Sequence, residues 1–272
     1  LLLVAERTWG LDQKEALPDA VRWDRDGLAA LRATEAGRRF EASWVEQRAY
    51  VDAAALALGQ PTIAERIAAI ATEVARWEAA VGADGWTAVD PGAAVRVGRW
   101  SLTLGGSGEA VHLADVDTGR VLADRDHPLG LLRYQSFDEA DYERFYAQLT
   151  PTPEDEWWAR WDNTKPGIDA AGAVSGEWTP SLVGAWQHDV GREVLARVTY
   201  RSVPAGRLGA PPKVWLRWSS SPDDDLDLDV AWLDKPANRL PEALWCSFEP
   251  LVAEPGRWRL DKLGQAVSPL DV

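Results

Sequence analysis

Several residue types are scarce in this chain, and each scarcity excludes something. The 272 residues contain no methionine, three histidines and a single cysteine. One cysteine excludes an internal disulfide framework, so the fold must rest on packing, and a reduced cytoplasm suits such a chain while leaving its compartment open. Cys246 stands in an expected strand, where a small buried apolar group is favoured over a nucleophile. No apolar run approaches the roughly 20 residues of a membrane-spanning helix.

Positive charge is also scarce. Lys and Arg number 29 against 43 Asp and Glu, which gives a net charge of -14. Phosphate recognition and binding to anionic membrane surfaces both need a basic surface, so neither nucleic acid nor a membrane is expected as a partner. The three histidines lie far apart, and none has a neighbour at ligand spacing, so we expect no zinc site made wholly within this chain. Homo-oligomerisation is left open.

Tryptophan is abundant, with 16 residues against four phenylalanines. An indole has a broad apolar face and one polar edge, which suits both sheet cores and sugar rings. The cluster Trp157, Trp158 and Trp161 lies beside acidic residues and would suit a sugar platform. We favour core packing for it, because neighbours in a strand point to opposite faces.

Helical periodicity dominates the first third of the chain. Apolar residues from Ile63 to Val81 recur at steps of three and four, and Thr62 with Glu65 forms a capping box. A second apolar stripe runs from Phe40 to Leu58 and stops at Gly59, and a shorter first helix precedes it. Short links between helices favour antiparallel neighbours, so residues 15–85 are predicted to form a three-helix bundle.

After Gly82 the pattern changes to short alternating segments separated by glycine and proline. Strands are predicted at 95–97, 100–104, 111–113, 194–200, 214–218 and 226–232. Many short strands with turns between them favour a β-sandwich over residues 86–272, interrupted by a helix at 136–149 that Ser136 and Glu139 would cap. The acidic run at 223–229 suits calcium, but its alternation is also what a half-solvated strand shows, and we favour the strand.

The chain opens with Leu1 to Ala5, which resembles a buried parallel strand that has lost its neighbours. Without methionine, the chain as given does not begin at a start codon. We therefore expect residues 1–14 to be the last strand and loop of a (β/α) barrel whose front part is missing. The predicted fold class is α+β, with the bundle and then the sandwich following this barrel strand.

Several segments resemble domain-of-unknown-function family 5054, which is in turn similar to glycoside hydrolase family 38, the α-mannosidases. The resemblance rests on Glu6 to Asp12, Glu41 to Arg48, Tyr134 to Phe137 with Asp141 and Tyr142, Asp234 to Phe248, Asp261 to Gly264 and Ser268 to Val272. It implies a barrel, a three-helix bundle and a galactose-mutarotase-like β-sandwich.

The resemblance also implies retaining hydrolysis of an α-linked glycoside, with zinc and a carboxylate nucleophile held mainly in the barrel. Catalytic residues and metal ligands are therefore not assigned to this chain. In one position the sequence departs from the expected pattern, since Arg7 stands where a histidine is expected. Either this loss abolishes activity, or Arg7 holds the loop or selects an anionic sugar.

Six residues are predicted to lie near a carbohydrate substrate in supporting roles: Glu6, Arg7, Trp9, Asp12, Arg239 and Glu242. Arg239 would contact sugar hydroxyls, with Glu242 orienting it, and the alternative is a structural Arg–Glu pair that fixes a turn. Asp12 has a comparable alternative as a turn residue before the first helix. A non-catalytic carbohydrate-binding or scaffolding protein is the competing functional hypothesis.

Overall fold

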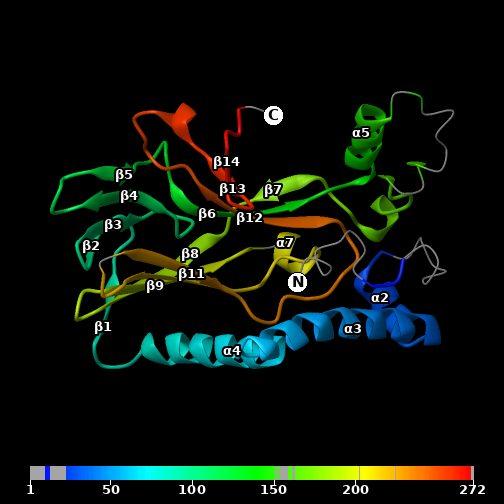
Figure 1. The fold of residues 1–272 in the computed structure, drawn as a ribbon. Helices are drawn as coiled ribbons and strands as arrows, with labels where there is room; N and C mark the ends of the chain where they lie inside the picture. The colour runs from blue at the N-terminus through cyan, green and yellow to red at the C-terminus, as the bar shows by residue number, and fades with distance from the viewer. Residues whose placement is uncertain are drawn as a thin grey trace.

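The computed structural model describes residues 10–12, 23–150, 152, 159–160, 163–201, 203–223 and 225–270. In this part of the chain the fold combines helices with antiparallel sheets and contains no barrel. The strand predicted at residues 1–5 lies outside the described residues. Figure 1 shows one sheet above another, with a row of helices beneath the lower sheet.

The helical segment begins with α2 (Arg25–Arg32), followed by α3 (Glu35–Ala57) and α4 (Ile63–Ala80). The predicted capping box of α4 is confirmed, because Thr62 accepts from the Glu65 backbone and the Glu65 side chain accepts from Thr62. Figure 1 shows α3 and α4 one after the other in a row, so the antiparallel three-helix bundle is not confirmed. Among the helices of the described residues, none is long and apolar enough to cross a membrane.

The lower sheet has five antiparallel strands in the order β1-β8-β9-β10-β11. Their bounds are Trp86–Val89, Ser181–His188, Glu193–Thr199, Val214–Ser220 and Leu226–Ala231. β11 confirms the strand reading of the acidic run, because Leu226, Leu228 and Val230 pack against the core while Asp227 and Asp229 are exposed.

The upper sheet follows the order β12-β6-β4-β3-β2, with β5 beside β4 and β7 beside β6. The strands β2 to β7 and β12 span Ala94–Val97, Trp100–Leu104, Ala110–Asp115, Val121–Ala123, Leu129–Ser136, Gly176–Trp178 and Glu242–Phe248. The strands predicted from alternation are confirmed, and β6 is a long central strand that the sequence did not indicate.

Smaller elements complete the fold. Helix α5 (Glu139–Leu149) extends from the end of β6, and its N-cap is Asp138, paired with Asp141, rather than the predicted Ser136 with Glu139. Asp138 is the cap because Ser136 still belongs to β6. The remaining elements are η1 (Asp169–Ala171), α7 (Val203–Gly206), η2 (Pro255–Arg257), β13 (Leu260–Lys262) and β14 (Gln265–Val267).

One core lies between the two sheets. Leu102 and Leu104 of the upper sheet belong to the same buried cluster as Val198, Leu216 and Trp218 of the lower sheet. A second cluster fixes α4 to the other face of the lower sheet, through Val74 and Trp77 packed with Leu195, Trp215 and Ala231. Of the predicted helical segment, α4 therefore packs directly on the lower sheet.

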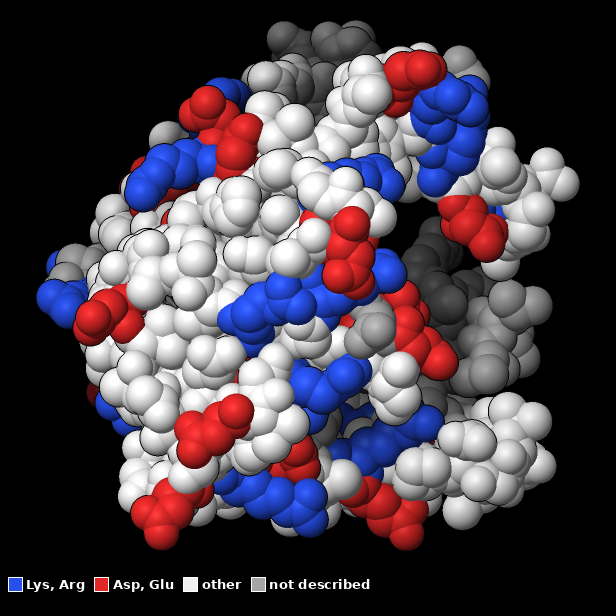
Figure 2. Space-filling model, turned by 90° about the vertical axis from the view of Figure 1, so that its left-hand side faces the viewer, with Lys and Arg blue, Asp and Glu red and all other residues white. Residues whose placement is uncertain are grey.

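The surface charge is mixed. On the face drawn in Figure 2, acidic and basic side chains are interspersed rather than gathered by sign. Part of this mixing is local pairing across strands, since Arg217 in β10 lies within ion-pair distance of Glu193 in β9 (2.7 Å) and Asp229 in β11 (3.3 Å).

Candidate functional site

The structure describes three of the six predicted site residues. Asp12, Arg239 and Glu242 are described, whereas Glu6, Arg7 and Trp9 lie outside the described residues. The tryptophans at 157, 158 and 161 lie outside them too. The candidate site therefore comprises the segments around Asp12 and Arg239.

The segment Gly10 to Asp12 lies against the middle of α3. The Leu11 N–H donates to Ser43 Oγ at 3.0 Å. Gly10 has a φ of +88°, and a Cβ there would stand 2.5 Å from Ser43 Oγ and 2.9 Å from Trp44 Cδ1. Only glycine allows both this backbone conformation and this close approach. The end of the first motif is thus in contact with Ser43 and Trp44 of the second, and Asp12 is exposed beside them.

A hollow of about 350 Å³ lies between α2, α3 and residues 237–239. We call it the α3 hollow. Trp44 lines it together with Phe40, whose ring meets the indole edge to face at a centroid distance of 5.0 Å. Asn238 and Arg239 also line it. Aromatic faces beside an amide and a guanidinium give the hollow both apolar and hydrogen-bonding surface.

Arg239 and Asn238 are held in different ways. The Arg239 guanidinium lies 4.7 Å from the ring centroid of the buried Trp23, a cation–π contact, and Trp23 Nε1 donates to the Pro166 carbonyl at 3.2 Å. The side-chain N and O of Asn238 are both buried, and no described residue forms a hydrogen bond with them. A Cβ at Gly209 would stand 2.0 Å from Asn238 Nδ2, so glycine is required where this amide packs.

Glu242 stands at the start of β12 and does not line the α3 hollow with Arg239. Tyr134 donates its hydroxyl hydrogen to Glu242 Oε2 at 2.8 Å, and Lys235 forms an ion pair with Oε1. The Gly209 N–H donates to the Tyr134 hydroxyl at 2.9 Å. Burial is the main cause that raises the pKa of Tyr134, and the Glu242 carboxylate adds to it. These contacts connect Glu242 to Lys235 and Tyr134 and fix the turn before β12.

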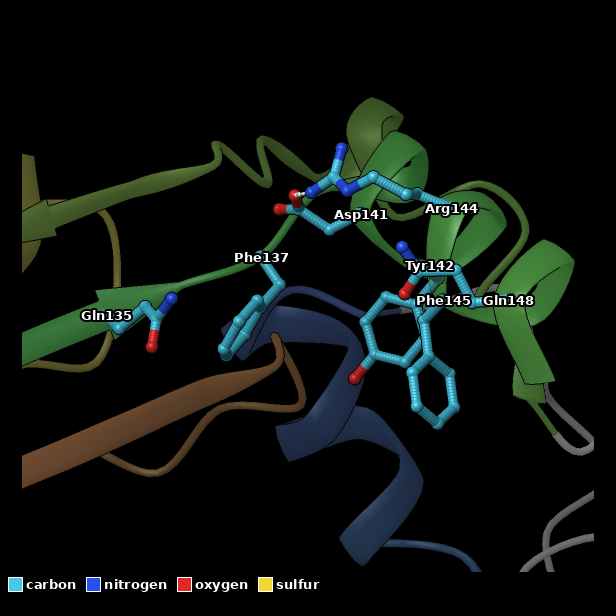
Figure 3. Close-up of a pocket in the computed structure, with 7 residues that line it drawn as sticks. All are labelled: Gln135, Phe137, Asp141, Tyr142, Arg144, Phe145 and Gln148. Atoms are coloured by element: carbon cyan, nitrogen blue, oxygen red, sulfur yellow. Dashed lines mark hydrogen bonds and ion pairs between the residues drawn. The ribbon is translucent and has the colours of Figure 1, made fainter.

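A second hollow, of about 450 Å³, lies between the end of β6 and helix α5. We call it the α5 hollow. Figure 3 shows Phe137 on one side of it and Tyr142 and Phe145 on the other, with Gln135 further along β6. Gln148 also lines it. The third motif of the resemblance, around residues 134–142, therefore builds an aromatic hollow with amide groups at its edges.

Asp141 and Arg144 form an ion pair at the rim of the α5 hollow (Figure 3). Burial opposes ionisation of Asp141, but hydrogen bonds from Ser175 and the Asp138 backbone, together with Arg144, outweigh it and lower its pKa. Asp141 is therefore an ionised, engaged carboxylate that also closes the capping box of α5.

Lys165 connects the two hollows. Its ammonium lies 5.5 Å from the ring centroid of Tyr142 in the α5 hollow and 5.8 Å from that of Trp23. Trp23 in turn contacts Arg239 of the α3 hollow. Two cations and two aromatic rings thus form a continuous row from one hollow to the other.

Within the described ranges, no three His, Cys, Asp or Glu side chains gather in a way that would hold a metal ion. The acidic side chains of the two hollows are engaged by basic partners, Asp141 by Arg144 and Glu41 by Arg32. The described residues therefore do not fit a zinc site, and none of their contacts supports a chemical step through a metal.

The sequence did not single out Trp23, Lys165 or Asn238. Trp23 and Lys165 have no periodic pattern around them, and their proximity depends on a contact between residues 143 positions apart, Trp23 and Pro166. Asn238 lies directly before Arg239 in a motif of the resemblance, so its position beside a predicted site residue was the available signal.

Comparison with known families agrees with part of the resemblance. The model of the family described as "Domain of unknown function (DUF5054)" matches residues 1–228, so the segment 234–248 lies beyond the match. No curated protein and no solved structure matches the chain. Since the matched residues make up more than half of the sequence, the chain belongs to the DUF5054 family.

Proposed function

We propose that this chain is the rear part of a glycoside hydrolase similar to family 38, which cleaves an α-linked glycoside with retention. In this proposal residues 1–14 close a (β/α) barrel, residues 15–85 form the helical bundle, and residues 86–272 form the β-sandwich. Zinc and the catalytic carboxylates belong to the barrel, where zinc would hold sugar hydroxyls. The described residues contribute binding surface.

One observation carries the binding role: segments far apart in the sequence meet around Trp44. Gly10 packs on Trp44, and Trp44 lines the α3 hollow with Asn238 and Arg239. Aromatic rings that stack on a sugar and planar polar groups that bind hydroxyls are what a carbohydrate site requires. The buried amide of Asn238, which lacks a partner, provides two such groups beside Arg239.

A non-catalytic carbohydrate-binding protein is the alternative. It is favoured by Arg7, which stands where the resemblance implies a histidine, because loss of a side chain that binds metal or substrate would remove turnover and leave the fold intact. Both proposals place the sugar at the same surface and differ in whether turnover follows.

The test measures zinc content and hydrolysis of a panel of aryl α-glycosides on the full-length protein. Arg239→Ala is expected to lower kcat/KM about 10-fold or more, because a charged hydrogen-bond donor to the sugar is lost. Arg133→Ala, which removes an exposed ion pair with Glu177 outside both hollows, is the control and should leave kcat/KM unchanged.

Unchanged kinetics in Arg239→Ala would remove the α3 hollow from the substrate site. Protein that is free of zinc and inactive, but binds sugars in a manner sensitive to Arg239→Ala, would support the non-catalytic alternative. Protein that neither hydrolyses nor binds any sugar of the panel would contradict both.

A further inference from the structure

A third cavity, which shares no lining residue with either hollow, lies between the edges of the two sheets. Its volume is about 270 Å³. Leu132 and Leu244 of the upper sheet line it, and so do Val214 and Val230 of the lower sheet. Since β11 and β12 are the edge strands of their sheets, the cavity lies where neither sheet continues.

One buried polar group lines this apolar cavity. The Tyr200 side chain is 2% exposed, and its hydroxyl is buried without a hydrogen-bond partner among the described residues. Buried hydroxyls in native proteins almost always have a partner, so an exception needs an explanation. The ring of Tyr200 packs on that of Tyr134 at a centroid distance of 6.0 Å, and the hydroxyl of Tyr134 is fully engaged. The two tyrosines differ in that only Tyr200 lines the cavity.

Two indoles and a thiol mark the outer part of the cavity. Trp232 and Trp245 line it and remain 40% and 48% exposed, and Trp245 Nε1 donates to Gln135 Oε1 at 2.9 Å. Cys246 also lines the cavity and is exposed, so the prediction that this cysteine is buried is wrong. Among the described strands, β12 is at the edge of its sheet and pairs on one side only, with β6.

We propose that this cavity binds a small, mainly apolar molecule that carries one hydroxyl or carbonyl group, a phenol or aryl alcohol, with that group hydrogen-bonded to Tyr200. A cavity of about 150 Å³ accepts benzene, so a volume near 270 Å³ has room for a substituted aromatic ring. The apolar wall binds the ring, and the single polar group satisfies the Tyr200 hydroxyl. This inference goes beyond the proposed function and does not depend on it.

Cys246 provides the measurement, because it is the single cysteine of the sequence. Although Cys246 is exposed, the side of it that lines the apolar cavity is partly desolvated, and this raises the pKa of the thiol. Alkylation with iodoacetamide is therefore followed at about pH 8.5, where enough thiolate forms. The probe is 4-methylphenol. Bound probe should slow alkylation of Cys246 at least 10-fold at saturation, and the dependence on probe concentration gives Kd.

Two comparisons test the role of the Tyr200 hydroxyl. Tyr200→Phe should weaken 4-methylphenol about 5- to 10-fold, which is the usual value of one hydrogen bond, and should leave toluene unchanged. Tyr142→Phe, in the α5 hollow, is the matched control and should change neither ligand. In the unaltered protein, toluene should bind more weakly than 4-methylphenol.

Alkylation that is indifferent to 4-methylphenol up to its solubility limit would overturn the site. Equal binding of 4-methylphenol and toluene to the unaltered protein would overturn the hydrogen bond to Tyr200, and this comparison stands even when Tyr200→Phe fails to fold. None of these outcomes depends on glycoside hydrolysis. A negative result for this cavity can therefore be distinguished from a negative result for the proposed function.

Discussion

Two buried tyrosines show how much depends on a single hydroxyl group. The rings of Tyr134 and Tyr200 meet at an interplanar angle of 61°, and both side chains are almost fully buried. The Tyr134 hydroxyl donates to Glu242 and accepts from the Gly209 N–H, whereas the Tyr200 hydroxyl has no partner in the part of the chain that the structure describes. The two hydroxyls therefore contribute oppositely to stability although both side chains are buried. A hydrogen-bonded hydroxyl stabilises the fold, whereas a buried hydroxyl without a partner destabilises it.

We predict that Tyr134→Phe lowers the free energy of unfolding by about 1–3 kcal/mol, since it leaves the Gly209 N–H without an acceptor and removes a donor from Glu242. Tyr200→Phe should leave the free energy of unfolding unchanged or raise it slightly. Urea unfolding followed by circular dichroism compares the two variants with the unaltered protein. A larger loss in Tyr200→Phe than in Tyr134→Phe would contradict this assignment.

At the scale of the strand, one glycine in β6 lets the backbone of the upper sheet lie close to side chains of the lower sheet. β12 pairs with β6 up to Ser247 and Leu131, and the register then shifts so that Phe248 pairs with Leu129. Gly130, at the shift, has a φ of +73°. A Cβ there would stand 2.8 Å from Leu228 Cδ2 in the other sheet. A bulge of this kind bends the strand, and in β6 it lets the backbone of one sheet approach the side chains of the other.

Gly130→Ala is therefore expected to lower the free energy of unfolding by roughly 1–3 kcal/mol, from the positive φ and from overlap with Leu228. Gly106→Ala, in the turn between β3 and β4, is the control, because a Cβ there meets nothing within 4 Å. Thermal unfolding measures both. A Gly130→Ala variant as stable as the control would show that the bulge relaxes without cost.

How far the sequence predicts these elements depends on how local their cause is. The capping box of Thr62 and Glu65 and the apolar period fix α4, and both are properties of neighbouring residues. The sequence does not indicate β6, because its pairing with β12 and its bulge depend on partners over 100 positions away, such as Trp245 paired with Arg133. The α5 cap was misplaced by two residues for the same reason, since the length of β6 decides where the helix begins.

At the scale of the molecule, part of the candidate site is predictable from sequence motifs, and part depends on packing between distant segments. Arg239 and the motif around Trp44 were singled out from the sequence, and the structure places Arg239 and Trp44 in one hollow. The row of Tyr142, Lys165, Trp23 and Arg239 was not predictable, because it depends on the packing of segments without periodic pattern.

The sequence predicts the apolar stripe of α4 but not how much of that stripe the lower sheet covers. Val74 and Trp77 of α4 are buried against the lower sheet, whereas Ile67 and Ile70 of the same stripe are 59% and 50% exposed. The periodicity predicts which face of the helix is apolar, and the length of the sheet beneath decides how much of that face is covered. Lys213, directly before β10, also forms an ion pair with Glu78 of α4.

We predict from this that the helices and the sheets unfold together, and that Trp77 couples them. Trp77→Ala should lower the free energy of unfolding by about 3–5 kcal/mol, because a buried indole leaves a cavity against Trp215 and Leu195. Ile67→Ala, on the same helix, should change it by less than about 0.5 kcal/mol. Urea unfolding is followed by far-ultraviolet circular dichroism for the helices and by tryptophan fluorescence for the sheet core. Coincident transitions shifted together in Trp77→Ala support the coupling; an early loss of helical signal with unchanged fluorescence would mean that the helices form a separate unit.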